Sequence, residues 1–452
     1  MDQFDELKKF KENSNPPSPP FSKGGLGGLS NPRVPQSSNP SKNSSILLTL
    51  IKEDINTPLE ERLKTILENE EIDWESLFKE AVYHKIAPVI YQNLKRANIA
   101  SVPDNFLKNL EAIYYGNARR NIRYLSELEK ILNSLRETGV EAIVLKGAAL
   151  AEEVYKNPAL RPVEDIDLLV RKFDFPAAKA VFKGEGYNEC KNEKLFPSKI
   201  RRDLEKKLHK PFEKFDYEAQ FSKNNREYLF DIHWDLLLIC ESKIKEEIQL
   251  NMDRIWERAK ITSFGTVSAC TMSPEDLLIY LCLHLRERHF ERARSRIIWW
   301  YDIYKVLETY KNKLDWDYFL SSLREYEICE SVFPLLLTLK ELLDPPFPAD
   351  LLKEFKNYSD IFPAEKIAPK ASEQLKFVEK HEERDYLSNL GEIRGIWKKA
   401  TLLLGDIFPQ REYMIIRYQI KNNKYLPLYY LLRLKNVLVR GLKAAFQILK
   451  SD

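Results

Sequence analysis

Two aspartates separated by one residue, Asp165 and Asp167, are the residues whose types and spacing most directly indicate chemistry. The run from Asp165 to Val170 is predicted to be a strand, and alternate residues of a strand point to the same side. The two carboxylates would share one face, roughly 6–7 Å apart along the strand, with Ile166 and Leu168 in a core on the other face. Because neighbouring carboxylates repel each other, a divalent cation between them would relieve the repulsion. Phosphoryl and nucleotidyl transfer need such a pair.

A short strand, a glycine turn and a helix are predicted directly before the two aspartates. The strand is expected over Glu141–Leu145, the turn at Gly147 and the helix over Ala148–Tyr155. N–H groups at a helix start attract phosphate together with the helix dipole, so we expect Gly147 to contact a phosphate. Lys146 and Arg161 are expected partners of a triphosphate. The alternatives are an ordinary turn glycine, and basic residues that lie at the surface or pair with the aspartates.

A β-hairpin is predicted after this unit, because Asn224–Asn225 is a two-residue turn signal between alternating segments. The predicted register pairs apolar with apolar residues: Phe221 with Tyr228, Ala219 with Phe230, Tyr217 with Ile232 and Phe215 with Trp234. The other face would carry Glu218 opposite Asp231, Asp216 opposite His233 and Lys214 opposite Asp235. Asp231 is a candidate third acid, and the solvated face of a hairpin is its alternative. His233 would assist proton transfer or bond to Asp216.

The elements that must position these residues divide the chain into five predicted regions. They are a disordered tract rich in Pro, Gly, Ser and Asn (1–45), a helical lobe (46–125), an α/β core (126–240), a helical domain (241–345) and a basic helical segment (346–452). Ser126 is expected to cap a helix that stops at Gly139. Ser273–Pro274 is expected to begin another helix. Beyond Leu238 we expect helices alone, within an α+β fold class with a mixed sheet.

The composition indicates a cytoplasmic protein that does not span a membrane. Of the 452 residues, 44% are hydrophobic, and the net charge of +3 is too small to imply nucleic acid by itself. No apolar run approaches the ~18–20 residues of a membrane-spanning helix, and we expect no secretory signal. The five cysteines show no CxxC spacing and are expected to be reduced. His284 and His289 are expected to be structural, with no zinc site.

The strand–glycine–helix–strand unit resembles the uncharacterised bacterial nucleotidyltransferases of the polymerase-beta-like superfamily. The resemblance rests on these runs: Val144–Gly147, Arg161–Pro162, Asp165–Val170 and Phe230–Trp234, with Tyr83–Lys85, Leu283–Leu285, Trp300–Asp302, Phe408–Pro409 and Tyr429–Arg433 outside the core. It covers roughly residues 46–450 and implies a palm-like core between helical lobes.

The resemblance also implies a reaction. An acceptor oxygen attacks the α-phosphate of a nucleoside triphosphate such as ATP, pyrophosphate leaves, and two Mg²⁺ ions assist. Asp165 and Asp167 would bridge the metals, and Asp231 would hold the acceptor-side metal and take the proton. Ala148 stands where the wider superfamily usually has serine or a second glycine. Phosphate binding would therefore rest on backbone N–H groups, Lys146 or Arg161.

Two other functions stay open on the sequence alone. One is a catalytically silent nucleotide- or protein-binding module on the same fold, which Ala148 favours. The other uses the basic residues near the end of the chain to bind RNA, an acidic partner or a membrane surface, although packing on the protein itself is commoner. These residues are Arg411, Arg417, Lys421, Lys424, Arg433, Lys435, Arg440, Lys443 and Lys450. The acceptor and the oligomeric state are not indicated.

Overall fold

The computed structural model describes residues 40–52, 58–69, 71–97, 99, 101–190, 218–236, 250–286 and 295–361, with residues 427, 430, 431, 434 and 435. Within these residues one seven-stranded mixed sheet has the order β3-β4-β5-β2-β1-β7-β6. Its strands are β1 Ala142–Val144, β2 Ile166–Val170, β3 Asn188–Glu189, β4 Glu218–Lys223, β5 Tyr228–His233, β6 Lys260–Phe264 and β7 Val267–Thr271. The β2–β5 and β1–β7 pairs are parallel, and the other pairs are antiparallel. The predicted mixed sheet among helices is confirmed.

The two faces of the sheet bury two separate hydrophobic cores because side chains alternate along each strand. Ile166 and Leu168 lie in the core beneath the sheet, as predicted, against the second half of α6 (Asp104–Glu137) and α8 (Phe175–Gly184). Leu169 lies in the other core, which the predicted N-terminal lobe and the helices after β7 share. Asp167 has the parity of Leu169 and therefore faces this second, helix-covered side.

The N-terminal lobe contains α2 (Pro40–Ile51), α3 (Leu59–Asn69), α4 (Trp74–Tyr83), α5 (Ala87–Ala97) and the first half of α6. Residues 40–45, which the sequence placed in the disordered tract, belong to α2. Asn43 explains the difference, because its buried amide donates to Glu80 Oε1 at 2.7 Å and to Ser76 Oγ at 3.1 Å. The rest of the predicted tract, residues 1–39, lies outside the described residues.

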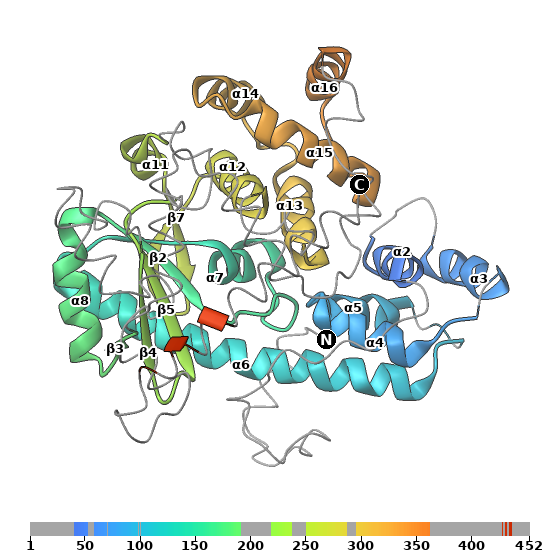
Figure 1. Cartoon of the computed structure of the whole chain (residues 1–452), viewed down its shortest axis with the longest axis horizontal. Coiled ribbons are helices and arrows are strands. Elements are labelled where there is room, and N and C mark those ends of the chain that lie inside the picture. The colour runs from blue at the N-terminus through green and yellow to red at the C-terminus, as the bar shows by residue number, and fades with distance from the viewer. Residues whose placement is uncertain are drawn as a thin grey trace.

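Helix α6 runs without a break for 34 residues, from the helical lobe to the sheet (Figure 1). The predicted cap at Ser126 is wrong, because this residue lies inside the helix. Buried residues recur every three or four positions along it: Phe106, Leu110, Tyr114, Asn117, Ala118, Asn121, Tyr124, Leu128, Ile131, Leu132 and Leu135. One continuous buried stripe thus joins both cores, and Gly139, at a φ of 74°, ends the helical segment as predicted.

The β4–β5 hairpin forms, but its predicted register is wrong by two residues. Phe221 pairs with Phe230, Gln220 with Asp231 and Glu218 with His233. The turn is four residues long, because Lys223 pairs with Tyr228, and three turn residues (Asn224, Asn225 and Arg226) have positive φ. A shift of two keeps every side chain on its predicted face, so the apolar alternation cannot distinguish the two registers.

The expectation of helices alone beyond Leu238 is also wrong. Strands β6 and β7 form a hairpin that pairs Phe264 with Val267 and adds to the sheet through β1. Gly265 and Thr266 make its two-residue turn, and the φ of Gly265 is 63°. Glu129 on α6 fixes the turn by accepting a 2.9 Å hydrogen bond from Thr266 N.

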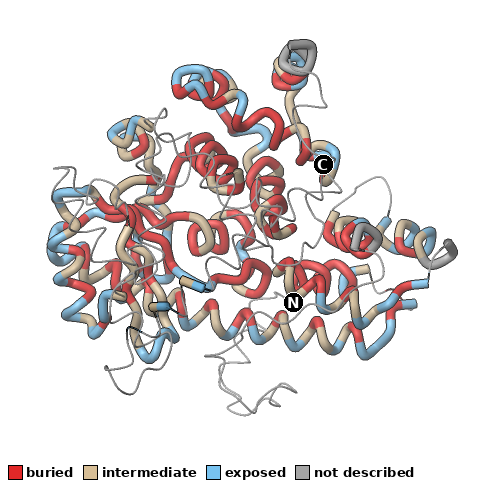
Figure 2. Tube along the Cα trace, viewed as in Figure 1, coloured by how far each residue is buried: buried red, intermediate tan, exposed pale blue. Residues whose placement is uncertain are grey.

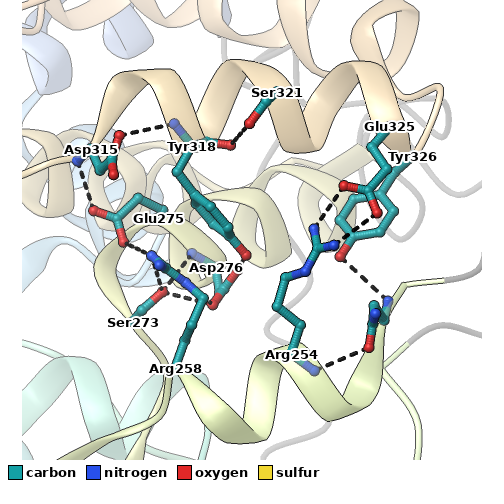
Figure 3. A network of polar contacts seen from close by, with 11 residues as sticks. Arg254, Arg258, Ser273, Glu275, Asp276, Asp315, Tyr318, Ser321, Glu325 and Tyr326 are labelled. Atoms are coloured by element: carbon teal, nitrogen blue, oxygen red, sulfur yellow. Dashed lines mark hydrogen bonds and ion pairs between the residues drawn. The ribbon is translucent and has the colours of Figure 1, made fainter.

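The remaining helices are α11 (Met252–Glu257), α12 (Pro274–Leu285), α13 (Ile297–Tyr310), α14 (Trp316–Glu325), α15 (Cys329–Leu343) and α16 (Ala349–Ile361). Ser273 caps α12 as predicted, accepting from Asp276 N. Arg258 binds Glu275 at 2.6 Å and joins α11 to α12 in the network of Figure 3. Figure 2 shows α12 and α13 buried along most of their length, at the centre of the molecule.

Of the predicted basic segment, the described residues are 346–361, which include α16, and residues 427, 430, 431, 434 and 435, so the role of its basic residues stays a prediction. No helix in the described ranges combines the length and apolar character needed to cross a bilayer.

Candidate active site

The three predicted acids meet where β2 lies beside β5. Asp167 and Asp231 are direct partners in this parallel pair, and Asp165 lies in a bend one residue before β2. Asp167 is buried, Asp231 is half-buried and Asp165 is exposed. The structure thus brings together an acid pair close in sequence and a third acid from a separate hairpin.

Asp167 is held by two nitrogens on one carboxylate oxygen. Lys146 Nζ lies 2.9 Å from Asp167 Oδ1, and His233 Nε2 lies 2.9 Å from the same atom. Burial alone would raise the pKa of Asp167, but Lys146 and His233 outweigh it and hold the pKa well below its usual range. Asp167 is therefore ionised at neutral pH.

The other two acids have raised pKa values. Asp165 is exposed as a residue, but desolvation by neighbouring protein atoms and the charge of Asp167 raise the pKa of its carboxyl to about 6. Desolvation and the charges of Asp167 and Asp165 raise the pKa of Asp231 to about 7. Gln220 Nε2 donates to Asp231 Oδ1 at 2.9 Å and orients it. The cluster therefore holds closely spaced negative charge that the neighbouring cations only partly offset.

The backbone turn that was predicted at Gly147 lies at Lys146. It opens α7 (Lys146–Leu150) with a φ of 42°, whereas Gly147 lies within the helix without a positive φ. A Cβ on Gly147 would meet Arg161 Nη1 at 3.9 Å, an ordinary contact. Lys146 Nζ also lies 5.6 Å from the ring centroid of Tyr280. The tight-turn role of Gly147 is therefore wrong, while Lys146 lies in the site as the partner of an aspartate.

Arg161 is paired with a buried carboxylate outside the acid cluster, rather than with an aspartate of the cluster or at the surface. Its Nε donates to Oδ1 and its Nη2 to Oδ2 of Asp302 on α13, each at 2.8 Å. Its Nη1 donates to the Pro162 carbonyl at 2.5 Å. Tyr155 OH donates to Asp302 Oδ1 at 2.8 Å. Tyr155 ends the π-helical continuation of α7 (η1, Ala151–Tyr155), within the helix predicted there. The guanidinium of Arg161 is committed to this network.

The loop between η1 and β2 is anchored on α6. Asn117 Nδ2 donates to the Ala159 carbonyl, Asn121 Nδ2 to the Pro158 and Arg161 carbonyls, and Tyr124 OH to the Glu164 carbonyl at 2.9 Å. These three side chains follow one face of α6, because they are four and three residues apart. The loop carries Asp165, so α6 sets the position of this acid.

His233 has partners other than the predicted one. Its Nε2 contacts Asp167, and its Nδ1 lies 3.4 Å from Glu218 Oε2 on the neighbouring strand. The predicted partner Asp216 lies outside the described residues. Sequence reasoning missed the roles of Glu218 and Gln220 because it placed them two residues away in register.

The donor chemistry suits a hard divalent cation, since three carboxylates crowd together and two have raised pKa values. Within the described ranges, no three His, Cys, Asp or Glu side chains already surround one point where a metal ion could sit. Asp167 Oδ1 is occupied by Lys146 and His233 instead. Of the two predicted structural histidines, His284 lies 6.2 Å from the Tyr280 ring, and His289 lies outside the described residues.

Fold and site define an α/β protein that carries an acid cluster on neighbouring parallel strands, with helices over both faces of the sheet. Residues 70–344, more than half of the chain, match the family described as uncharacterised nucleotidyltransferase, and the chain belongs to this family. The match includes every acid of the cluster and supports general nucleotidyl transfer. A comparison with curated proteins found no match.

Proposed function

We propose that this protein is a Mg²⁺-dependent nucleotidyltransferase with a polymerase-beta palm-like core. It would move a nucleoside monophosphate from a nucleoside triphosphate to a hydroxyl or phosphate oxygen of an acceptor. The observation that carries the proposal is the meeting of Asp167 and Asp231 across the parallel β2–β5 pair, with Asp165 beside them. Membership of the nucleotidyltransferase family supports the same reaction class.

Asp165, Asp167 and Asp231 are the residues that would hold Mg²⁺. Magnesium is usually bound through one or two carboxylates together with substrate phosphates, so a ready-made protein cage is not required. When bound, Mg²⁺ would lower the pKa of the acceptor oxygen and neutralise charge on the leaving group.

The chain's own groups supply the proton transfer and the positioning. As the acceptor oxygen bonds to the α-phosphorus and the bond to pyrophosphate breaks, Asp231 would accept the acceptor's proton. Gln220 orients this carboxyl, and His233 orients Asp167. Lys146 would donate to a phosphate oxygen of the donor while it stays paired with Asp167.

A catalytically silent binding module is the second candidate. The observation that favours it is the compensated charge of Asp167, which already has Lys146 and His233 on one oxygen. Nucleotide binding would then occur without transfer, and substitution of the acids would leave partner binding intact.

Thermal unfolding with ATP, GTP, CTP or UTP, each with and without Mg²⁺, tests the proposal without the acceptor. A ligand at 100 times its Kd stabilises a protein by about 2.7 kcal/mol. We expect a Mg²⁺-dependent rise in Tm for the wild type that is lost in Asp165→Asn. This variant should fold normally, because Asp165 is exposed and loses an unfavourable charge.

The matched control is Asp253→Asn on α11, whose side chain is 89% exposed. It should respond to nucleotide as the wild type does. No shift with any nucleotide would remove the proposed function, and an equal shift in Asp165→Asn would separate nucleotide binding from the acid cluster.

A further inference from the structure

The turn between α4 and α5 holds a lysine in a backbone conformation that favours glycine. Lys85 has a φ of 59°. Its N–H donates to the Val82 carbonyl at 3.1 Å, and Ile86 N donates to the Ala81 carbonyl at 3.0 Å. These two bonds form a Schellman motif, in which glycine is the usual residue at the left-handed position. A lysine there is less favourable for the backbone, so its side chain is the feature to explain.

His84, the residue before Lys85, connects the turn to α13 by hydrogen bonds. His84 Nδ1 accepts from Ile297 N at 3.3 Å, and the His84 carbonyl accepts from Ile298 N at 3.3 Å. These N–H groups belong to the first turn of α13, where Arg296 provides no side-chain cap. Burial and the charge of Arg296 lower the pKa of His84 to about 3, so the imidazole is neutral and can accept. The turn is therefore fixed on the helix that carries Asp302.

From this fixed turn the side chain of Lys85 reaches the acid cluster. Its Nζ pairs with Glu164, the residue directly before Asp165. The Lys85 side chain is 16% exposed, whereas that of Glu164 is 54% exposed. The lysine is thus held mostly among protein atoms, and its only paired carboxylate in the described residues lies largely in solvent.

Among the described residues, Lys85, Lys146 and Arg161 interact with Asp165 or Asp167, and their paired carboxylates differ in burial. The Asp302 side chain that pairs with Arg161 is 2% exposed, and the Asp167 side chain that pairs with Lys146 is 8% exposed. Breaking such buried pairs is strongly unfavourable. In the Lys85–Glu164 pair only the lysine is buried, so Glu164 can return to solvent when a ligand takes its place beside the ammonium. Lys85 is therefore the cation that can exchange its partner for a ligand most easily.

We propose that Lys85 binds a phosphate group of the nucleotide, leaving Glu164 as it does so. The assignment rests on the proposed function and adds to it a phosphate-binding residue from the helical lobe. It also replaces Arg161, whose donors are committed to Asp302 and Pro162. The left-handed turn and the His84 contacts direct the ammonium toward the strand that carries the acids.

Substitution by glycine separates this role from a structural one. Lys85→Gly removes the ammonium and relaxes the left-handed backbone, so its Tm without ligand should equal or exceed that of the wild type. Its affinity for the Mg²⁺ complexes of ATP, GTP, CTP, UTP and inorganic tripolyphosphate, measured by calorimetric titration, should fall tenfold or more. Lys85→Arg keeps the charge and should stay within a few-fold of the wild type.

The matched control is Lys156→Gly, because Lys156 is exposed and also has a positive φ, of 52°. It should leave phosphate affinity unchanged. Wild-type protein that binds none of the five probes would remove the proposed function and the role of Lys85 together. Nucleotide binding that is equally tight in the wild type and Lys85→Gly would overturn the role of Lys85 alone.

Discussion

At the scale of single residues, the positive charge beside Asp167 allows a carboxylate to stay buried within the acid cluster. A buried carboxylate is unfavourable unless it is paired, and Lys146 and His233 provide the pairing. Asp165 and Asp231 have less compensation, and their pKa values rise. The sequence predicted the three acids and left open that Lys146 pairs with an aspartate. It could not predict the partner of Arg161, because Asp302 lies 141 residues away.

Removal of the Lys146 ammonium tests this balance. Lys146→Met should lower the free energy of unfolding by about 3 kcal/mol, because a buried charge loses its partner. Urea unfolding of Lys146→Met, Asp167→Asn and the double variant forms a double-mutant cycle, and the double variant should recover part of the loss.

The control for this cycle is Lys79→Met on α4. Its exposed pair with Glu75, whose side chain is 78% exposed, should contribute less than about 1 kcal/mol. Equal losses in Lys146→Met and Lys79→Met would contradict the central role of the Asp167 pair.

At the scale of elements, the alternation of apolar and polar residues predicted which face of the sheet a side chain occupies. It did not predict which residue of the neighbouring strand lies opposite. The hairpin kept its apolar face while the longer turn moved Gln220 and Glu218 beside Asp231 and His233. Turn length depends on local backbone conformations, here three positive φ values, that composition alone does not fix. The missed β6–β7 hairpin did carry a signal, the Gly265–Thr266 pair between alternating residues.

The turn at His84 gives a prediction for how the stability of the protein changes as the pH falls. Below pH 6.5, its ordinary pKa, the unfolded chain binds a proton at His84 that the folded protein excludes down to about pH 3. Stability from this group is therefore complete above pH 6.5 and is lost as the pH falls through that window, by up to about 1.4 kcal/mol per pH unit. His84→Asn keeps an acceptor and should show a shallower loss between pH 6.5 and 4 in urea unfolding. Parallel pH profiles would contradict this account of the turn.

At the scale of the whole molecule, regions that the sequence separated share one core. Leu50 of α2, Leu145 beside the sheet and Leu336 of α15 belong to the same buried cluster. The predicted boundary at residues 125 and 126 falls inside α6. A linker can be recognised from the sequence only where the composition changes. Along α6 the helical spacing of buried residues continues unchanged from one core to the other. The buried pair between Arg161 and Asp302 adds a polar link between the loop and α13.

We therefore expect residues 40–361 of the intact chain to unfold as one cooperative unit in calorimetry. Asp302→Ala leaves Arg161 buried without its carboxylate and should lower the stability of that whole unit by about 3–5 kcal/mol. Asp317→Ala, at an exposed position of α14, should change it by less than about 0.5 kcal/mol. Two separate transitions for the lobe and the sheet would contradict a shared core.

The unbroken α6 also limits how this protein can be engineered or recombined. A helix turns by about 100° per residue, so one residue inserted between Ala118 and Asn121 would rotate one half of α6 against the other. Asn117 would then no longer face the loop together with Asn121 and Tyr124. Grafts between relatives should therefore exchange α6 whole, with its crossover points in the turns on either side of it.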